Sequence, residues 1–380
     1  MSVGDRHEAN GLLTAGAVRE AAEGMLLLAE SSSLPQWRVD LSRMEAAADL
    51  TAETVRMNYP DLNVPFHARW RHFTAGGRDL WAEARKPSDP LELGRAAFDL
   101  VIPSVLLDAG AGPTWRYRDA TGAELSRSEG LGVASLRMWE TGALNDLSAV
   151  TGASVAEAFQ VSDDNPLPGV EGRAVLLRRL GATVGRPRKL FDLMAARSRG
   201  GKLDAEDILE VLLQELGPIW PGRLSRGGVP LGDCWPHPIP GHRPVPLHKL
   251  SQWMSYSLIE PLRWAGIEVV NINELTGLAE YRNGGLFVDT GALALRNPDD
   301  AGIAHPVGSP VVVGWRALTV ALLDRLAPMV RERLGVTAKA FPLACVLEGG
   351  TWAAGRRIAR QLRPAAGGPP ITVISDGTVF

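Results

Sequence analysis

The sequence has very little cysteine, and this limits the compartments that suit it. Cys234 and Cys345 are the two cysteines among 380 residues, so the chain carries no disulfide framework of the kind found in small secreted domains. The first 24 residues have early acids and lack an apolar run long enough for a signal peptide or a membrane span. We therefore expect a cytoplasmic protein.

The sequence also lacks an excess of positive charge. Lys and Arg number 40 against 43 Asp and Glu, which gives a net charge of −3. Proteins held by nucleic-acid phosphates or anionic membranes need a basic excess. We expect a small-molecule substrate, with neither nucleic acid nor membrane as partner, and the oligomeric state stays open.

Strand-like alternation is scarce, and helical spacing dominates. Short alternating pieces are limited to "RAVLL", "GLFVD", "PVVVG" and "ITVIS", which is too little for a repeating βαβ series. Apolar residues recur at three- and four-residue intervals in ten segments, which predicts a mainly α, multi-helix fold. These segments are 12–30, 42–58, 91–110, 131–160, 171–181, 204–216, 247–264, 273–282, 314–334 and 350–362.

One long stretch, 228–246, is rich in proline and glycine. Its prolines exclude a continuous helix. We predict a single two-lobed unit over 1–380, with approximate lobes 1–227 and 247–380 joined by this segment.

Lysine is rare, which draws attention to Lys249. Five of the 40 basic residues are Lys, and Lys249 opens an apolar helical pattern in which Trp253 faces the core. Tyr256 and Glu260 follow Lys249 at seven and eleven residues, on one helical stripe. Lys249 is either an active-site ammonium or a surface residue whose stem lies along a half-buried helix.

The stretch "GLAEYRNGGLFVDTGAL" places Glu280 beside Tyr281 and Arg282. The pattern predicts that Glu280 lies in the last turn of helix 273–282, before an Asn-Gly-Gly turn. A carboxylate there opposes the helix dipole, so it belongs either to an active site or to a salt bridge with Arg282. Asp289, inside the next apolar run, either contacts substrate or caps the following turn.

Histidines suggest a metal site, which the spacing disfavours. His237, His242 and His248 lie with Asp233 and Cys234 in the proline-rich stretch, and they form neither a helical i, i+4 pair nor a CxxC clip. We expect no metal and no other cofactor.

Two further motifs are candidates for anion binding. "FHARWRHF" gathers His67, Arg69 and Arg71 among aromatic residues, either to hold a phosphate or as a helix with a buried aromatic face. "LEGGTWAAGRRIA" places Gly349 and Gly350 before a helix, where backbone N–H groups bind anions.

Long motifs of this chain closely resemble the uracil catabolism protein four family, from about residue 10 to the end. That family belongs to a uracil degradation route through ribosylurea, and the resemblance implies cleavage of ribosylurea or its phosphate to urea and the sugar. The motifs include "VPFHARWRHF", "DLVIPSVLLDAGAGPTWRY", "LGDCWPHP", "PLHKLSQWMSYSLIEPL", "GLAEYRNGGLFVDTGAL" and "VLEGGTWAAGRRIA".

A weaker resemblance concerns the fold. "LTGLAEYRNGGLFVDTGAL" and the Lys249 helix look like stretches of queuosine salvage nucleosidases, which are similar to helix-hairpin-helix DNA glycosylases. Lys249 and Glu280 occupy the positions of the catalytic Lys and acid, although Glu280 replaces an Asp. The resemblance implies that these two are catalytic. The substrate-binding candidates are His67, Arg69, Arg71, His248, Trp253, Tyr281, Arg282, Asp289 and Glu348.

The implied reaction separates charge along a C–N bond, and a carboxylate such as Glu280 would stabilise the sugar cation and activate water. Glu260, Asp289 and Glu348 are the alternative acids. Two other classes stay open: a hydrolase of ureido C–N bonds, and a non-catalytic partner of a pathway enzyme.

Overall fold

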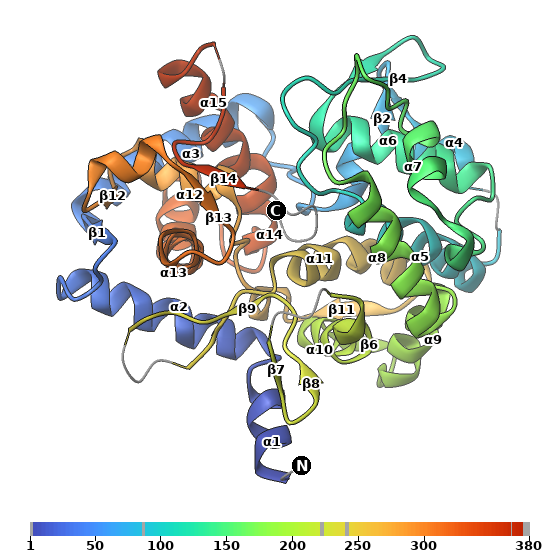
Figure 1. The fold of residues 1–380 in the computed structure, drawn as a ribbon, viewed down its shortest axis with the longest axis horizontal. Coiled ribbons are helices and arrows are strands. Elements are labelled where there is room, and N and C mark those ends of the chain that lie inside the picture. Colours follow the sequence, from blue (N-terminus) through green and yellow to red (C-terminus); the bar gives the residue numbers. More distant parts are fainter. Residues whose placement is uncertain (1–2, 86–87, 221–223, 240–242, 366, 375–380) are drawn as a thin grey trace. The chain divides into compact units, whose positions relative to one another are not determined.

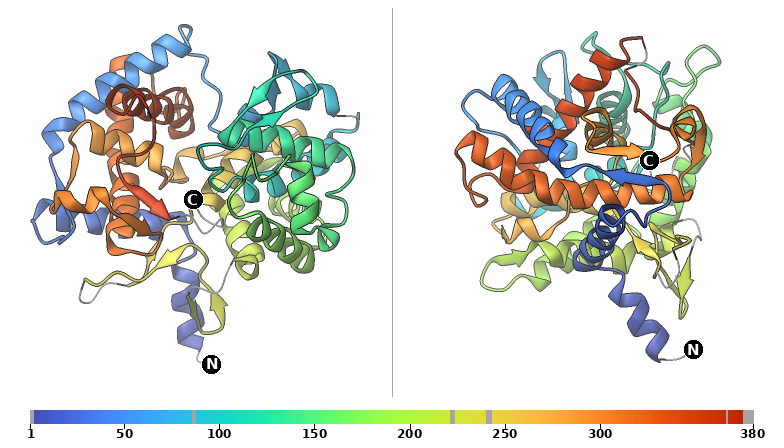
Figure 2. Two further views of the ribbon diagram at one scale, coloured as in Figure 1. Left: turned by 45° about the horizontal axis from the view of Figure 1, so that its top comes forward. Right: turned by 90° about the vertical axis from the view of Figure 1, so that its left-hand side faces the viewer.

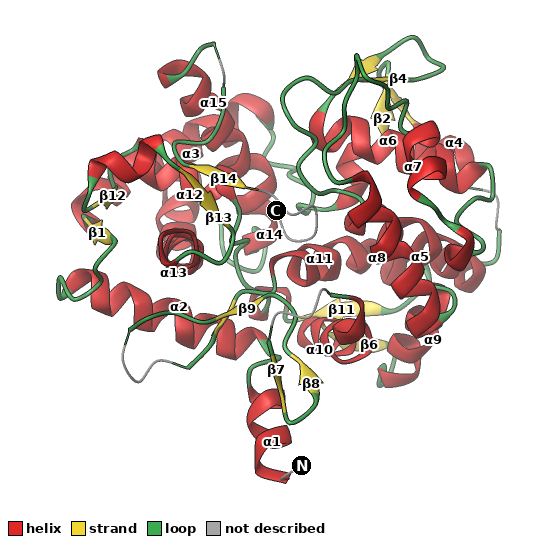
Figure 3. Ribbon diagram, viewed as in Figure 1, coloured by secondary structure: helices red, strands yellow, loops and turns green. Residues whose placement is uncertain are grey.

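The structure is a computed structural model, and it describes residues 3–85, 88–220, 224–239, 243–365 and 367–374. Helices dominate it, and the strands are short and scattered (Figure 3). This confirms the mainly α prediction. Among the described residues, no helix is both long and apolar enough to cross a membrane.

The chain divides into two compact units that alternate along the sequence (Figure 1). The first takes its described residues from Met1–His67, Arg223–Gln252 and Ile272–Ile374, and the second from Ala68–Gly222 and Trp253–Asn271. The division does not follow the predicted lobes 1–227 and 247–380. Long helix α11 (Lys249–Trp264) contributes its first turn to the first unit and the rest to the second.

The first unit is organised around α13 (Pro310–Leu334), which is buried along most of its length. Ser309 caps its start, Pro310 occupies the first turn and Gly335 ends it with a φ of 70°, as expected for helix termini. Helices α2, α3 and α12 pack on it, and Figure 2 (right) shows α13 from its side. The other helical elements of this unit are α1 (Val3–Gly11), α2 (Ala15–Glu30), η1 (Leu41–Arg43), α3 (Met44–Asn58), η5 (Ile272–Glu274), α12 (Tyr281–Asp289), η6 (Pro298–Gly302), α14 (Leu343–Cys345), the π-helix η7 (Val346–Thr351) and α15 (Trp352–Leu362).

The strands of the first unit form two-stranded pairs only. β1 (Trp37–Val39) pairs antiparallel with β12 (Leu293–Leu295). In the proline-rich stretch, β7 (Ser225–Arg226) pairs with β8 (Val229–Pro230), and β9 (Cys234–Trp235) pairs with β10 (Val245–Pro246). β13 (Ala304–Pro306) runs parallel to β14 (Thr372–Ile374).

The second unit contains most of α11 and a group of helices around it. Trp253, Leu258 and Leu262 of α11 are buried, in agreement with the prediction that Trp253 faces the core. The other elements are η2 (Arg69–His72), β2 (Thr74–Ala75), β3 (Arg78–Asp79), α4 (Leu80–Ala84), α5 (Pro90–Leu106), β4 (Tyr117–Arg118), β5 (Glu124–Leu125), α6 (Arg127–Glu140), η3 (Leu147–Ala149), α7 (Gly152–Ala158), α8 (Val170–Val184), α9 (Arg188–Arg197), β6 (Lys202–Asp204), α10 (Ala205–Leu216), η4 (Gly217–Ile219) and β11 (Glu268–Val270).

Several sequence-based predictions of local structure are wrong. The segment 131–160 is not one helix, because Gly142 takes a φ of 81° just after α6, a conformation that glycine adopts without strain. "RAVLL", "GLFVD" and "PVVVG" lie in helices α8, α12 and α13 instead of strands. "ITVIS" contains β14, as predicted.

Candidate active site

Glu280 is the N-cap of α12, and both oxygens of its carboxylate bind the helix start. Oε2 accepts the N–H of Arg282 at 2.7 Å, and Oε1 accepts the N–H of Asn283 at 2.6 Å. These N–H groups have no partner inside the helix. The side chain is nearly buried, with 7% of the residue exposed. The orientation of the Glu280 carboxylate is therefore fixed by the backbone N–H groups of the residues that follow it.

This position corrects the sequence-based prediction for the segment. The predicted helix 273–282 is absent: η5 ends at Glu274, a buried loop follows, and α12 begins at Tyr281. Asn283, Gly284 and Gly285 lie inside α12 and form no turn. Glu280 thus lies at the N-terminal end of α12, where the helix dipole favours a negative charge.

The ionisation of Glu280 is strongly perturbed. Burial raises its pKa to about 7, although the N–H of Asn283 and the positive charges of Lys249 and His67 all act to lower it. A carboxyl group that titrates near neutral pH can take and return a proton under physiological conditions. Lys249, at the first turn of α11, supplies a cation to this carboxylate.

His67 and Glu348 form a second acid–base pair in the same unit. Nδ1 of His67 lies 2.6 Å from Oε2 of Glu348, and the two side chains are 6% and 12% exposed. The backbone N–H of His67 donates to the carbonyl of Ala344, and its ring lies 6.0 Å from that of Trp352. The pair therefore has a fixed orientation.

Glu348 lies in the π-helix η7, which contacts the start of α12. The hydroxyl of Thr351, three residues after Glu348, donates to Oδ1 of Asn283 at 2.8 Å. Gly355 of α15 approaches α12 closely, because a Cβ there would lie 2.2 Å from the carbonyl oxygen of Arg282. Asn283 and Thr351 thus join the segment that carries Glu280 to the segment that carries Glu348.

The prediction that Gly349 and Gly350 form an anion-binding site at a helix start is wrong. Helical structure starts at Leu343 and continues through η7 into α15, so these glycines are not at a helix start. Their small size serves packing instead, because a Cβ on Gly350 would lie 2.6 Å from Cγ2 of Thr51 on α3.

A buried ion pair between Asp233 and Arg316 positions both catalytic candidates. The guanidinium of Arg316 donates to both carboxylate oxygens of Asp233, at 2.8 and 2.7 Å. Asp233 Oδ2 also accepts the backbone N–H of Lys249 at 2.9 Å. Nε of Arg316 donates to the carbonyl of Ala279, the residue before Glu280, at 3.1 Å. One ion pair therefore holds the starts of α11 and α12.

Sequence reasoning missed Asp233 as a positioning residue and missed Arg316 and Asn283 altogether. One signal was present: Arg316 lies in the apolar run "VVVGWRALTVALL", and a charge in such a run is buried only with a partner. Its partner is 83 positions away in sequence, which no local spacing rule reveals.

Tyr281 and Arg282 occupy the first turn of α12. The Arg282 guanidinium lies 5.0 Å from the Tyr281 ring centre and donates to the carbonyl of Gly367 at 2.9 Å. The salt bridge considered for Arg282 and Glu280 does not form. Among the described residues, no carboxylate contacts the buried Arg282 side chain.

Asp289 and His248 have other contacts. Asp289 ends α12 and accepts two hydrogen bonds from Arg363, at 2.8 and 2.5 Å. Asp289 follows Glu280 by nine positions, which corresponds to a rise of about 13.5 Å along a helix. His248 is buried with a φ of 46°, and its Nε2 lies 2.9 Å from the carbonyl of Leu12. Burial lowers the pKa of His248, so it is suited to a structural role.

The remaining predicted residues belong to the second unit, where acids already bind the arginines. Arg69 lies 3.0 Å from Asp108 and 5.6 Å from the Trp253 ring centre. Arg71 donates to both oxygens of Glu260 at 2.8 Å. Glu260 is thereby bound as well, which weakens its case as the catalytic acid.

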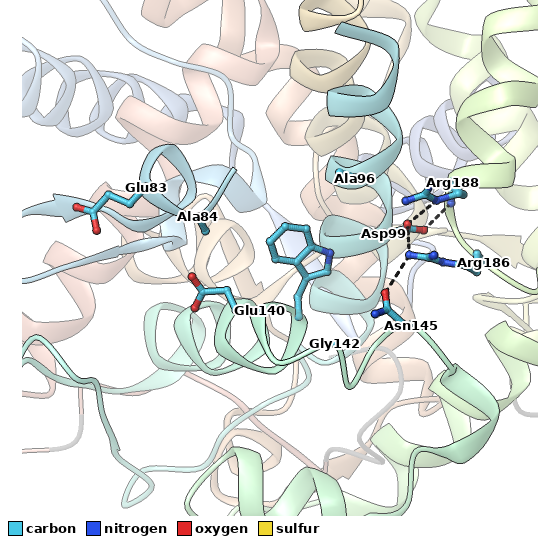
Figure 4. Close-up of a pocket in the computed structure, with 10 residues that line it drawn as sticks. Glu83, Ala84, Ala96, Asp99, Glu140, Gly142, Asn145, Arg186 and Arg188 are labelled. Atoms are coloured by element: carbon cyan, nitrogen blue, oxygen red, sulfur yellow. Dashed lines mark hydrogen bonds and ion pairs between the residues drawn. The ribbon is translucent and has the colours of Figure 1, made fainter. Parts of the chain in front are cut away.

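A cavity of about 500 Å³ lies in the second unit, and it contains none of the predicted site residues (Figure 4). Asp99 is paired there with Arg186 and Arg188 at 2.6 and 2.7 Å. Asp99 is therefore already occupied by two cations.

The histidines considered as metal ligands do not gather into a metal site in the described part of the chain. Within the described ranges, no group of three or more His, Cys, Asp or Glu side chains is arranged to hold a metal ion. His242, one of the histidines considered above, lies outside those ranges.

These features define a mainly α protein with a buried acid–base cluster at the start of a short helix. The chain belongs to the family described as "Protein of unknown function (DUF1688)", whose model matches residues 11–380. It is 39% identical to Protein urg3 of Schizosaccharomyces pombe over 97% of this chain and 98% of that protein. It is 35% identical to Uracil catabolism protein 4 of Lachancea kluyveri over 90% and 92%. The predicted membership of the uracil catabolism protein family is confirmed.

Replacing Asp233 tests the positioning ion pair. Burial would raise the pKa of Asp233, but the charge of Arg316 and the hydrogen bonds of Arg316, Trp235 and Lys249 hold it well below its usual range. The stabilisation is therefore present above about pH 4, the pKa of an unfolded aspartate, and is lost as pH falls. At neutral pH, Asp233→Asn should cost about 3–5 kcal/mol of unfolding free energy in guanidinium titration.

The matched control is Glu53→Gln, which removes an exposed ion pair with Arg357. It should cost about 0–1 kcal/mol. Equal losses for the two variants would show that the Asp233–Arg316 pair does not stabilise the first unit.

Proposed function

We propose that this protein acts in uracil catabolism as an N-ribosyl hydrolase, and that it cleaves ribosylurea or its 5-phosphate to urea and ribose or ribose phosphate. The name of the Lachancea kluyveri relative, Uracil catabolism protein 4, supports the pathway. The observation that carries the reaction is Glu280, a buried carboxyl whose pKa of about 7 suits proton transfer near neutral pH.

The bond that breaks sets the requirements of the site. As the C1–N bond of ribosylurea lengthens, positive charge develops on the sugar ring and negative charge on the leaving nitrogen. A carboxylate stabilises the first charge and accepts a proton from the attacking water. Each oxygen of Glu280 uses one acceptor position for the helix N–H groups and has another for water.

Lys249 supplies the cation that keeps part of the Glu280 population ionised. Its positive charge lowers the pKa of Glu280 against the effect of burial. The backbone N–H of Lys249 donates to Asp233, so the Lys249 side chain extends from a helix turn that is fixed in position. Lys249 thus orients and activates the base in this mechanism.

A phosphorylated substrate would need a cation that is not already neutralised. Arg69 and Arg71 bind Asp108 and Glu260. Arg282 has no carboxylate among its contacts in the described part of the chain, and it is two residues from Glu280. It is therefore the best candidate for holding a phosphate.

The first test measures urea release from ribosylurea and from its 5-phosphate. Glu280→Gln keeps the size of the side chain but removes the base, so the rate should fall at least about a hundredfold. Lys249→Met should lower the rate as well, because the base loses its cation. Urea is quantified with purified wild type and both variants.

Glu274→Gln and Lys202→Met are the controls, because both residues lie outside the cluster. They should retain wild-type rates. If wild type releases no urea from either substrate, the N-ribosyl hydrolase proposal is wrong, and a ureido hydrolase or a non-catalytic pathway partner becomes the better explanation.

The pH dependence follows from the raised pKa of Glu280. The base acts as the carboxylate, so kcat/KM should rise about tenfold per pH unit up to about pH 6 and level off near pH 7. In Lys249→Met the same rise should move to higher pH, because the lost cation lowered the pKa. A flat profile between about pH 5 and 7 would mean that Glu280 is not the base.

Arg282→Gln distinguishes the two possible substrates. If Arg282 holds a phosphate, the variant should raise KM for the 5-phosphate at least about tenfold and leave KM for ribosylurea within about twofold, since one charge-assisted contact is lost. Steady-state kinetics with both substrates measures this. Equal changes for the two substrates would exclude phosphate binding by Arg282.

A further inference from the structure

The pair of His67 and Glu348 has no role in the water activation described above, yet its geometry is that of a catalytic dyad. Nδ1 of His67 lies 2.6 Å from the Glu348 carboxylate. A carboxylate on one ring nitrogen fixes the orientation of a histidine and stabilises its protonated form. A histidine oriented in this way through Nδ1 acts as an acid through the proton on its other ring nitrogen, Nε2.

The surroundings of His67 keep it in a single position. Its backbone donates to Ala344, its ring packs near Trp352, and only 4% of the residue is exposed. Glu348 is held by η7, and the Thr351–Asn283 hydrogen bond joins η7 to the start of α12. The charge of His67 acts on Glu280. His67, Glu348 and Glu280 therefore belong to one buried cluster. Glu348 orients His67, and the backbone at the start of α12 holds Glu280.

The reaction requires a group of this kind. Loss of urea as an anion is unfavourable, so the departing nitrogen needs a proton while the C1–N bond breaks. Glu280 cannot supply that proton in the same step, because it accepts one from water. A second group with the opposite protonation state must act at the same time.

We propose that His67, oriented by Glu348, is the general acid that protonates the leaving ureido nitrogen. This inference rests on the proposed N-ribosyl hydrolase function. Lys249 then serves as the cation for Glu280 and does not act as the proton donor.

The electron pair of the C1–N bond moves to the ureido nitrogen, which takes the Nε2 proton of the His67 imidazolium and leaves as neutral urea. The oxygen of water bonds to C1, and one of its protons passes to Glu280. Glu280 returns a proton and His67 regains one through solvent, so the enzyme is restored and one water is consumed.

The test compares kcat and KM for urea release by His67→Gln, by Glu348→Gln and by wild type. His67→Gln should lower kcat by about 10²–10⁴-fold with KM within about threefold, as expected when a general acid is lost. Glu348→Gln should lower kcat by a smaller factor, because His67 itself remains and loses only the carboxylate that orients its ring. Glu348 is thus a positioning residue.

His305→Gln is the matched control. His305 is also buried, with 8% of the residue exposed, it lies in the same unit, and its Nε2 is 2.7 Å from the carbonyl oxygen of Asp300. Its kcat should equal that of wild type, and thermal melting of all variants reports whether they are folded.

Ribosylthiourea separates acid catalysis from a structural role. Sulfur replaces oxygen with little change in shape, and the thiourea anion is more stable, so this leaving group depends less on a proton. The deficit of His67→Gln should shrink at least about tenfold with ribosylthiourea. The deficit of Glu280→Gln should stay the same, because water still attacks the sugar.

The outcomes are distinct. Wild type that releases no urea contradicts the proposed function itself. An active wild type with an active His67→Gln contradicts only the assignment of His67. An equal deficit of His67→Gln on both substrates, or a change confined to KM, also overturns it, because His67 would then hold the substrate without protonating it.

Discussion

The ion pair between Asp233 and Arg316 is the constraint on which the candidate site depends. Removing two charges from water is unfavourable unless their hydrogen-bonding capacity is used. Here the carboxylate accepts from Arg316, Trp235 and the Lys249 backbone, and Arg316 also binds Ala279. Two of the groups that satisfy the pair therefore belong to the backbone segments that carry Lys249 and Glu280. The contacts that make burial of this ion pair favourable are therefore the same contacts that place Lys249 and Glu280.

Glu280 combines two demands that oppose each other. As an N-cap it is most favourable when ionised, because its oxygens accept helix N–H groups. Burial favours the neutral acid. The resulting pKa of about 7 means that neither demand prevails, and a small change in the surrounding charge shifts the balance. Such a group stabilises the helix less than an ordinary ionised cap does, but it exchanges a proton more readily near neutral pH.

The sequence predicted the long helices well because their apolar spacing is regular, as in α2, α11 and α13. It failed at 273–282, where Leu275, Leu278 and Ala279 have helical spacing but are buried in a loop. The scarcity of lysine and the local pattern marked Lys249 and Glu280 as candidates, and the family resemblance implied that they are catalytic. Arg316 and Asn283 were missed, since their roles arise from tertiary contacts between distant segments.

The π-helix η7 has a consequence for how this site was built. A π-turn contains one residue more than the α-helical turn it replaces, and each residue of an α-helix turns the next by about 100°. The inserted residue therefore uncouples two faces of one continuous helix. Gly355 can stay against Arg282 while Glu348 faces His67. A single extra residue in a helical turn is thus enough to direct Glu348 toward His67 while Gly355 keeps its packing against α12.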